Sequence, residues 1–324
     1  MRAMVIREPG DESVLTLQER PTPELLAGHV RVRVKFTGVN RADLLQRMGL
    51  YPPPAGVPVD IPGLEYAGVI EEVSKGVHSV EVGQRVFGLV PGGSYAEYVV
   101  VHEREAVRIP EGLPDDAAAA VPEAFVTAYD ALVLRGSLRP GERVMIHAVG
   151  SGVGTAALQI AKALGCHVTG TSRTESKLER AKELGLDVGI LTRDTTDLSQ
   201  QLTKAAPFDV TMDLVGGDYV GATIQAMSVR GRIVVVGLTG GIRSELDLRT
   251  LLSKRLTIVG TVLRSRPLEE KIQAADVLRR TLSPWLHRHM IKPIIERTYE
   301  LANAADAHRL VGSNTTFGKV LLAL

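Results

Sequence analysis

Residues Met145-Ile-His-Ala-Val-Gly-Ser-Gly-Val-Gly-Thr155 form a glycine-rich junction between two kinds of pattern. Before the junction, Arg143 to Ala148 is a short apolar run with the length of a buried strand. After it, apolar residues recur at helical spacing, and Gly165 is placed to cap the helix end. The apolar residues of this set are Val153, Ala156, Ala157, Ile160, Ala161 and Leu164. The pattern predicts a strand, a tight turn and a helix in direct succession.

Such a junction suits a phosphate group. Glycines let the backbone approach a pyrophosphate, whose charge the free amides and the dipole of a helix N-terminus stabilise. Gly150 and Gly152 match the pattern G-x-G-x-x-G, but Thr155 stands at the third position and Gly154 comes one residue early. An ordinary strand-to-helix turn explains an isolated match equally well. The context favours a dinucleotide, because a second strand, His167 to Ser172, ends roughly 20 residues on, where a ribose would lie.

The end of this second strand bears on the choice of dinucleotide. Enzymes that use NAD carry Asp or Glu there to hold the ribose hydroxyls, whereas this chain has Ser172 and Arg173. Lys177 follows one helical turn after Arg173, so both cations are predicted to face a 2′-phosphate. The sequence therefore predicts NADPH. Two alternatives stay open: a solvated surface pair, and Glu175 as the acid that holds the ribose.

The rest of the chain divides into two kinds of pattern. Further strands at Asp209 to Val215 and Arg232 to Gly237 each follow a helical segment, which predicts a doubly wound parallel sheet. Upstream of about residue 120, short β segments predict a partly open barrel; they are Val30 to Phe36, Gly68 to Val73, Gln84 to Leu89 and Tyr95 to Val101.

The tail has a helix that begins near Pro267 and a last strand, Gly318 to Leu322. On that helix, Leu268, Ile272, Ala275 and Leu282 fall on one face. The tail is too small for a core of its own, so it is expected to complete the first domain. The expected domains are residues 1–121 and 261–324 for one, and 122–260 for the inserted nucleotide domain.

Composition excludes several classes of protein. The 324 residues include 38 Lys and Arg against 37 Asp and Glu, a net charge of +1 that gives no support to a nucleic-acid or acidic-membrane partner. The single cysteine, Cys166, fits a reducing cytoplasm and cannot form an internal disulfide. The N-terminal residues lack the apolar run of a signal peptide. Apolar runs such as Ile233 to Leu238 are far shorter than the roughly 18 residues that cross a bilayer.

Several motifs together give the chain a family resemblance over nearly its whole length. They are Gly38-Val-Asn-Arg-Ala-Asp-Leu-Leu-Gln-Arg47, Tyr51-Pro-Pro-Pro54, Gly63-Leu-Glu-Tyr-Ala-Gly68, Pro122-Glu-Ala-Phe-Val-Thr127, Ile146 to Ala156, Leu263-Arg-Ser-Arg266 and Gly318-Lys-Val320. The chain resembles the zinc-free medium-chain dehydrogenases/reductases of the quinone oxidoreductase (zeta-crystallin-like) family, and most closely their p53-inducible branch. The resemblance implies a GroES-like catalytic domain, a Rossmann domain inserted into it, NADPH, and a cleft between the two domains.

The resemblance also implies the residues that contact the cofactor. Two of them depart from the common pattern of the family: Ser151 replaces a glycine, as in the p53-inducible branch, and Thr192 replaces a tyrosine. The implied cofactor contacts are Asn40, Thr127, Gly150, Ser151, Gly152, Val153, Ser172, Arg173, Lys177, Thr192, Val215, Gly237, Leu238, Leu263 and Ser265.

No catalytic metal is expected. Zinc-dependent relatives carry the motif G-H-E-x-x-G and a cysteine in an earlier loop, but here Leu64 replaces the histidine and Asn40 replaces the cysteine. Cys166 lies beside a predicted strand, which indicates buried packing. Glu65 is expected to be structural. Without thiolate or imidazole at these positions a tetrahedral zinc site cannot be assembled.

The predicted activity is NADPH-dependent reduction of quinones, because quinones accept electrons without the electrophilic help that zinc gives to a carbonyl. Tyr51, Asn40 and Ser151 are the candidate catalytic residues. Three prolines after Tyr51 are expected to stiffen its loop, although an ordinary surface tyrosine fits as well. Asn40 and Asp43 can instead cap a helix from Ala42 to Met48.

The sequence leaves open the reaction and the environment of the loop after the inserted domain. An NADPH-dependent enal or enone reductase and a nucleotide-bound binding protein with negligible turnover remain possible functions. Arg264 and Arg266 either rim the mouth of the substrate site or lie on a solvated loop. For the assembly, the resemblance implies a homodimer in which Leu256 to Val262 is the outer Rossmann strand and pairs with its two-fold mate.

Overall fold

The computed structural model describes residues 1–193 and 196–324. By their contacts these residues form two compact units: unit 1 comprises Met1–Val126 with Leu263–Leu324, and unit 2 comprises Thr127–Val262. Unit 2 is thus inserted into the chain of unit 1. The sequence-based boundaries, 121/122 and 260/261, lie close by along the chain. The first of them falls where helix α3 (Pro122–Tyr129) begins, whereas the division by contacts falls inside that helix.

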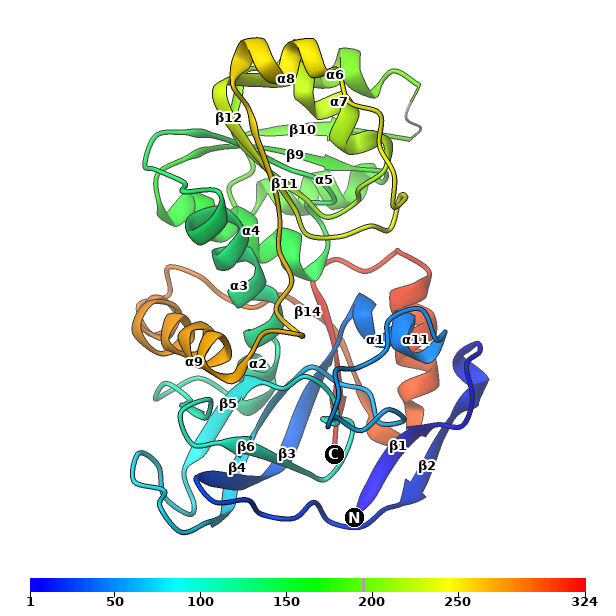
Figure 1. Ribbon diagram of the computed structural model, residues 1–324, viewed down its shortest axis with the longest axis vertical. Helices are drawn as coiled ribbons and strands as arrows, with labels where there is room; N and C mark the ends of the chain where they lie inside the picture. The colour runs from blue at the N-terminus through cyan, green and yellow to red at the C-terminus, as the bar shows by residue number, and fades with distance from the viewer. Residues whose placement is uncertain (194–195) are drawn as a thin grey trace. The chain divides into compact units, whose positions relative to one another are not determined.

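Unit 1 is built on a seven-stranded sheet in which β14, β15, β3, β4, β5 and β7 follow one another and β6 pairs with β3. A separate two-stranded sheet joins β1 and β2. The C-terminal tail, orange to red in Figure 1, returns to this unit, where β15 runs antiparallel to β3. The strands are β1 (Arg2–Ile6), β2 (Leu15–Glu19), β3 (His29–Val39), β4 (Glu65–Val73), β5 (Arg85–Leu89), β6 (Tyr98–His102), β7 (Val107–Arg108), β14 (Ile295–Glu300) and β15 (Lys319–Ala323).

Alternation along β3 explains the place of this strand in the sheet. Val30, Val32 and Val34 are buried, while Arg33 and Lys35 are exposed, an alternation of period two that is typical of a half-buried strand. The three valines contribute to a core with residues of β4, β5 and β6. Each of the four strands predicted in this region overlaps one of β3 to β6.

Short helices complete unit 1. Their bounds are α1 (Arg41–Arg47), α2 (Asp115–Ala119), α9 (Leu268–Val277), α10 (Ser283–His287) and α11 (Ala304–Gly312), with shorter helical turns at Glu12–Val14, Leu278–Leu282 and Leu301–Asn303. The predicted apolar face of the tail helix is right for Ile272, Ala275 and Leu282, which are buried. It is wrong for Leu268, which is 41% exposed. Leu268 is the first residue of α9, directly after Pro267, the N-cap residue.

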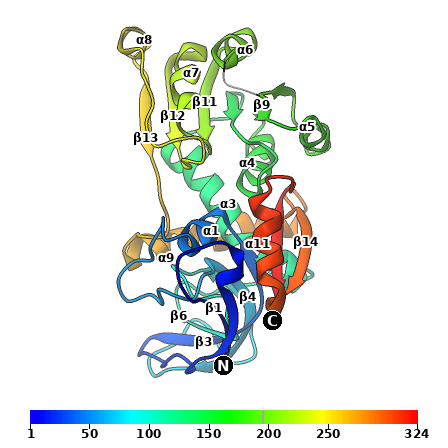
Figure 2. The same cartoon turned by 90° about the vertical axis from the view of Figure 1, so that its right-hand side faces the viewer.

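Unit 2 is a six-stranded parallel sheet in the order β10-β9-β8-β11-β12-β13. Figure 2 shows β13, β12, β11 and β9 in this succession across the sheet. The strands are β8 (Arg143–Ile146), β9 (His167–Ser172), β10 (Val188–Leu191), β11 (Phe208–Asp213), β12 (Met227–Val235) and β13 (Thr257–Gly260). The order equals the 3-2-1-4-5-6 arrangement of doubly wound dinucleotide-binding sheets, with β8 as the first strand. The neighbours β8 and β11 therefore mark the switch point, outside whose carboxyl ends such sheets bind ligands.

Helices connect the strands of unit 2. The helix α4 packs against β8 and β9, and α7 packs against β11 and β12. Their bounds are α4 (Gly152–Ala163), α5 (Glu175–Lys182), α6 (Leu198–Ala205), α7 (Asp218–Ala226) and α8 (Leu248–Lys254), with a further helical turn at Asp130–Arg135. Gly165 follows α4 with a φ of 73°, the left-handed conformation expected after a helix end.

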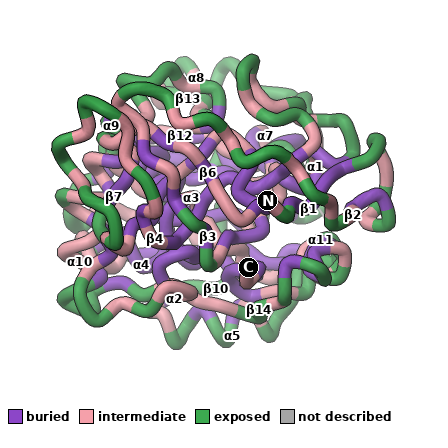
Figure 3. Tube along the Cα trace, turned by 90° about the horizontal axis from the view of Figure 1, so that it is seen from below, coloured by how far each residue is buried: buried purple, intermediate pink, exposed green. Residues whose placement is uncertain are grey.

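Burial follows the two sheets. Buried stretches of the trace run through the interior strands, and exposed stretches follow the outer loops and helix surfaces (Figure 3). On β8, Val144, Met145 and Ile146 are all fully buried, as expected of a central parallel strand. Among the described residues no helix is long and apolar enough to cross a membrane.

Candidate active site

The turn between β8 and α4 has the geometry of an anion-binding helix start. Ser151 is the N-cap: its Oγ accepts a hydrogen bond from the amide of Gly154 at 3.0 Å and donates one to the carbonyl of Ala148 at 2.8 Å. The first main-chain bond of the helix runs from the amide of Thr155 to the carbonyl of Ser151. The amides of Gly152 and Val153 precede that bond and are placed for an anion at the helix N-terminus.

Close packing explains a glycine of this turn. A Cβ atom on Gly154 would lie 2.4 Å from the carbonyl oxygen of Ala148, so only glycine lets the helix start against the end of the strand. Ala148 itself has a φ of 55°, a left-handed conformation that costs a residue other than glycine roughly 1 kcal/mol. The turn is therefore held in a strained, closely packed shape, as is usual for a backbone that cradles a ligand.

Most of the predicted cofactor residues of unit 2 lie at one edge of the sheet. They follow the carboxyl ends of parallel strands, which meet at the same edge. The residues are Gly150, Ser151, Gly152 and Val153 after β8, Ser172 and Arg173 at the end of β9, Thr192 after β10, Val215 after β11, and Gly237 and Leu238 after β12. Thr127 is different, because it lies within α3 and is only 8% exposed. The structure thus brings ten predicted residues together at the edge where such sheets bind nucleotides.

The proposed determinants of cofactor choice lie before α5 and in its first turns. Ser172 closes a tight turn, since its Oγ donates to the carbonyl of Thr174 and accepts from the amide of Thr174, both at 3.1 Å. Arg173 is exposed next to this turn, and Lys177 is half-buried in the first turns of the helix. Glu175 is also exposed, so its alternative role as the acid that holds the ribose stays open.

Thr192 is committed to the protein interior. Its side chain is 1% exposed, and its Oγ1 accepts a hydrogen bond from the hydroxyl of Tyr219 at 3.0 Å. A direct cofactor contact from Thr192 stays a prediction.

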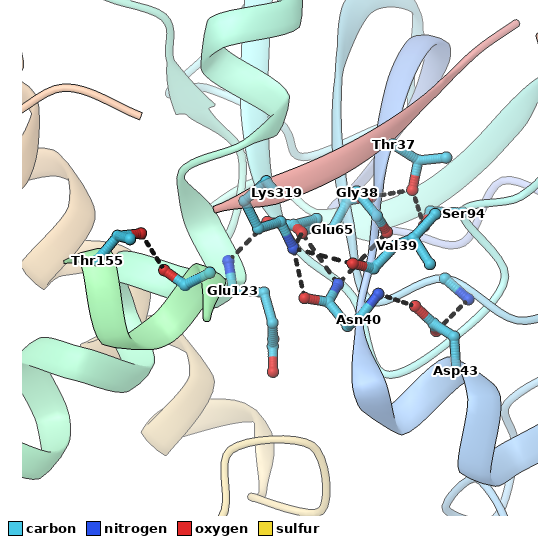
Figure 4. A network of polar contacts seen from close by, with 12 residues as sticks. Thr37, Gly38, Val39, Asn40, Asp43, Glu65, Ser94, Glu123, Thr155 and Lys319 are labelled. Atoms are coloured by element: carbon cyan, nitrogen blue, oxygen red, sulfur yellow. Dashed lines mark hydrogen bonds and ion pairs between the residues drawn. The ribbon is translucent and has the colours of Figure 1, made fainter. Parts of the chain in front are cut away.

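Unit 1 contains a buried cluster around Lys319 (Figure 4). The ammonium group of Lys319 lies 2.7 Å from Oε1 of Glu65 and donates to Oδ1 of Asn40. Glu65 is fully buried and Lys319 is 5% exposed, so the two charges compensate each other away from water. Gly38 makes room for the cluster, because a Cβ atom there would lie 2.0 Å from Oε1 of Glu65. Glu65 is therefore structural, as expected.

The side-chain amide group of Asn40 uses its hydrogen-bonding atoms within this cluster. Its Nδ2 donates to Oε1 of Glu65 at 2.9 Å and to the carbonyl of Gly38 at 3.3 Å, while its Oδ1 accepts from Lys319. Both amide hydrogens are therefore used. A hydrogen bond from Asn40 to a substrate or cofactor would require one of these bonds to break.

Asp43 holds the segment after Asn40. Its carboxylate accepts from the amide of Asn40 at 2.8 Å and from the amide of Gly63 at 2.9 Å, so it caps α1, as the sequence allows. Burial raises the pKa of Asp43 to about 6, although both amide bonds and the nearby Lys319 and Arg264 favour its charged form.

The loop that carries Tyr51 is anchored by Arg264. The guanidinium donates to the carbonyls of Pro91 at 2.7 Å and Tyr51 at 3.0 Å, and to the side chain of Gln46. It also lies over the ring of Tyr51, 5.1 Å from its centre. Arg264 is only 7% exposed, so the solvated-loop alternative is wrong for this residue. Burial raises the pKa of the Tyr51 hydroxyl, which has no hydrogen-bond partner among the described residues.

One acidic side chain is absent from the candidates that the sequence supplies. Glu123, the second residue of α3, lines a cavity of about 20 Å³ in unit 1 together with Leu64, Leu263 and Arg264. Burial, followed by the charge of Glu65, raises the pKa of Glu123 to about 8. Its motif Pro122 to Thr127 contributes to the family resemblance, but no pattern along the chain reveals that this carboxyl lines a cavity.

The residues of the cluster do not form a metal site of ordinary composition. Within residues 1–193 and 196–324, no three His, Cys, Asp or Glu side chains are grouped to hold a metal ion. Leu64, which replaces a ligating histidine, is 2% exposed and apolar, and Cys166 is buried with its Sγ against the carbonyl of Arg139. Independence from zinc stays a prediction for the protein in solution.

Comparison with known proteins agrees with this architecture. Residues 26–111 match the model of the alcohol dehydrogenase GroES-like domain, and residues 152–279 match the model of the zinc-binding dehydrogenase. The chain is 32% identical to the quinone oxidoreductase of Rattus norvegicus over 100% of this chain and 98% of that protein. It is also 32% identical to part of the polyketide synthase GfsB of Streptomyces halstedii, over 99% of this chain but 6% of the synthase. The solved quinone oxidoreductase of Coxiella burnetii superposes with a TM-score of 0.83 at 27% identity, over 100% of this chain and 99% of that one.

A GroES-like unit interrupted by a parallel dinucleotide-binding sheet defines the medium-chain dehydrogenases/reductases. The chain belongs to the quinone oxidoreductase family within that class. The predicted fold class, a Rossmann sheet inserted into a GroES-like β-rich domain, is confirmed. The protein is an oxidoreductase, and its fold indicates a nicotinamide nucleotide as cofactor.

Proposed function

We propose that the protein is an NADPH-dependent quinone oxidoreductase that works without a metal ion. The observation that carries the proposal is the position of Lys319. Its ammonium group lies between Asn40 and Glu65, beside the residues that replace the zinc ligands of metal-dependent relatives. Without a Lewis acid there, the enzyme needs an acceptor that is already electrophilic, and quinones meet that need.

The cofactor site of unit 2 fits a dinucleotide. The amides of Gly152 and Val153 would hold its pyrophosphate at the start of α4, and Arg173 and Lys177 would hold the 2′-phosphate of NADPH. When bound, the nicotinamide supplies a hydride. Asn40, Thr127, Leu263 and Ser265 remain proposed contacts from the family resemblance.

The residues of unit 1 bind and orient the quinone. The hydroxyl of Tyr51 donates a hydrogen bond to the quinone oxygen that gains negative charge, and Arg264 fixes the loop that carries Tyr51. Asn40 positions this region through Glu65 and Lys319, since both of its amide hydrogens are used there. Ser151 acts on the nucleotide side as the cap of α4. A bulky side chain at this position would crowd the nucleotide.

A panel of acceptors tests the proposal. Oxidation of NADPH is measured with quinones, enals, enones and alcohols, with and without prior chelation. Turnover of quinones that survives chelation is the expected result. Preference for enals or enones would indicate the second candidate, a 2-alkenal reductase, which uses the same cofactor geometry. NADPH binding without oxidation by any acceptor would indicate a nucleotide-bound binding protein.

We also infer a homodimer formed through the edge of the unit 2 sheet. Strand β13 is an outer strand, and apolar side chains stay exposed close to it along the chain. These are Leu248 at 66%, Leu252 at 79% and Val262 at 48% exposure. Light scattering at micromolar concentration tests the dimer, which a monomeric mass would refute. A cytoplasmic location, expected from the single cysteine, is the corresponding proposal for the cell, and fractionation tests it.

A further inference from the structure

The backbone of Glu123 contacts the Lys319 cluster, whereas its side chain points away from the cluster. The amide of Glu123 donates to Oε2 of Glu65 at 2.8 Å. The side chain then leads away from Lys319, and its carboxyl group lies on the far side of the peptide (Figure 4). The buried ion pair therefore fixes the position of Glu123 while it leaves the carboxyl group uncommitted.

The carboxyl group of Glu123 lines a cavity in unit 1. Among the described residues, none donates a hydrogen bond to this carboxyl group or forms an ion pair with it. The cavity of about 20 Å³ that it lines has room for one or two water molecules. Its wall is apolar where Leu64, Leu89 and Leu263 contribute, and the lining also includes the cationic residues Arg264, Arg266 and Lys271. An uncommitted acid beside such a small, largely apolar space is unusual for a purely structural residue.

The charges around Glu123 favour its protonated form on balance. Glu65 and Asp43 oppose its ionisation, and Lys319 and Arg264 favour it. Arg266 and Lys271 line the same cavity, and Arg266 is paired with Glu270 at 3.7 Å. Burial outweighs each of these charges, so the pKa is raised to about 8, which favours the protonated form at neutral pH.

Glu123 and Tyr51 belong to one site in unit 1. The charge of Glu123 contributes to the raised pKa of the Tyr51 hydroxyl, and the guanidinium of Arg264 lowers it. Arg264 both lines the cavity of Glu123 and stacks on the ring of Tyr51. Arg264 therefore links the ring of Tyr51 to the cavity that Glu123 lines, which supports placing both side chains at one substrate.

We propose that Glu123 is the acid that protonates the reduced substrate. The inference rests on the proposed quinone reductase activity and adds a catalytic residue to it. Transfer of a hydride to a quinone gives a hydroquinone monoanion. The O–H bond of the Glu123 carboxyl breaks, an O–H bond forms on the anionic oxygen, and neutral hydroquinone leaves. A proton from the solvent, relayed by water in the cavity, then returns to the carboxylate, so each turnover consumes one solvent proton and regenerates the acid.

The test compares Glu123→Gln with Glu123→Asp and with a matched control, Glu105→Gln. Glu105 is also a half-buried carboxyl whose pKa burial raises, and it lines the adjoining cavity with Lys271. The pH profile of kcat/KM for a quinone is measured for each variant, with the Kd of NADPH. Infrared spectroscopy at neutral pH, compared with Glu123→Gln, reports whether Glu123 carries a proton.

The wild-type kcat/KM is expected to fall as the pH rises through about 8. In Glu123→Gln this fall of kcat/KM at high pH should disappear, and kcat should be about 10- to 100-fold lower. The Kd of NADPH should change little. Glu123→Asp should recover part of the rate with its pH dependence, and Glu105→Gln should behave as wild type. Unchanged turnover and pH profile in Glu123→Gln, or an ionised Glu123 at neutral pH, would overturn the acid role while the quinone activity stands. Failure of the wild type to oxidise NADPH with any quinone would overturn both.

Discussion

Nζ of Lys319 lies 2.7 Å from Oε1 of Glu65, and neither residue is more than 5% exposed. Lys319 begins β15 in the C-terminal tail, and Glu65 begins β4. The ion pair thus joins segments that are 254 residues apart in the sequence. It also holds Asn40 and the amide of Glu123, so one buried contact supports the region where Tyr51 and Glu123 are proposed to act.

Removal of the cation should be strongly destabilising. Lys319→Met leaves the carboxylate of Glu65 buried without a compensating charge, with hydrogen bonds from Asn40 and the amide of Glu123, and we expect the free energy of unfolding to fall by about 3–5 kcal/mol. The double variant Lys319→Met/Glu65→Gln removes both charges and should lose less. Urea unfolding measures both. In the pair of Lys35, 47% exposed, and Asp115, 15% exposed, Arg85 also binds the carboxylate, so the change Lys35→Met should cost under about 1 kcal/mol. Equal losses at the two lysines would contradict the account of the cluster.

Cofactor preference should depend on Arg173 and Lys177. We expect NADPH to bind roughly 10- to 150-fold more tightly than NADH, since one charge-assisted hydrogen bond to the 2′-phosphate contributes about 1.5–3 kcal/mol. Replacement of both cations with alanine should remove most of this difference and leave the Kd of NADH nearly unchanged. Calorimetric titration measures the four constants. Glu175→Gln tests the alternative in which Glu175 holds the ribose, and a wild-type protein that binds both cofactors equally would refute the assignment.

The hydroxyl of Tyr51 should matter more for turnover than for cofactor binding. Tyr51→Phe removes a hydrogen bond that strengthens as the quinone oxygen gains charge, and we expect kcat to fall roughly 3- to 50-fold. The Kd of NADPH should stay the same, because the ring still stacks under Arg264. Steady-state kinetics with a quinone check both values. Full turnover in Tyr51→Phe together with a loss in Asn40→Ala would assign the donor to Asn40.

Acid should destabilise the protein through His308. This side chain lies between the hydroxyl of Tyr95 at 3.1 Å and the guanidinium of Arg47 at 3.4 Å, and burial, with the charge of Arg47, lowers its pKa from 6.5 to about 3. Below pH 6.5 His308 therefore binds a proton in the unfolded chain but stays neutral in the folded chain until the pH approaches 3. The contribution of neutral His308 to the free energy of unfolding is complete above pH 6.5 and is lost as the pH falls. The loss is about 2 kcal/mol at pH ~5.

Unfolding of His308→Gln against pH isolates this effect. The variant should show a shallower loss of stability between about pH 6.5 and 4 than wild type, because its amide does not titrate. The exposed His287 offers the matched variant His287→Gln, which should keep the wild-type slope. A variant at position 308 that shows the full wild-type slope would rule out this origin of the acid sensitivity.

The nucleotide-binding half of the fold was predictable because its signals are local. The apolar run before Gly150, the helical spacing after Val153 and the glycine at 165 each depend on neighbours within a few residues. Position 151 shows what local patterns can and cannot predict. Serine is a preferred N-cap, so its hydrogen bond to the amide of Gly154 follows from local rules, whereas any catalytic role depends on distant groups.

The candidate site of unit 1 depends on contacts that no local pattern carries. Asn40 has the chemistry of a hydrogen-bond donor for a substrate. In the folded chain, however, its side-chain amide is hydrogen-bonded to Glu65 and to Lys319, which is 279 residues away in the sequence. Arg264 fits a solvated loop equally well by sequence, and only its bonds to Tyr51, Pro91 and Gln46 in the folded chain exclude that environment. Glu123 was missed because its chemistry comes from burial and from the charge of Glu65, which only the folded chain brings near it.

The measurement that tests the central claim most directly is anaerobic oxidation of NADPH by a para-quinone, with protein that has been treated with a chelator. The account predicts that the metal-stripped protein consumes NADPH and produces one hydroquinone for each NADPH, with NADH a much poorer reductant. Loss of activity on chelation that returns with zinc, or equal use of NADH, would contradict it.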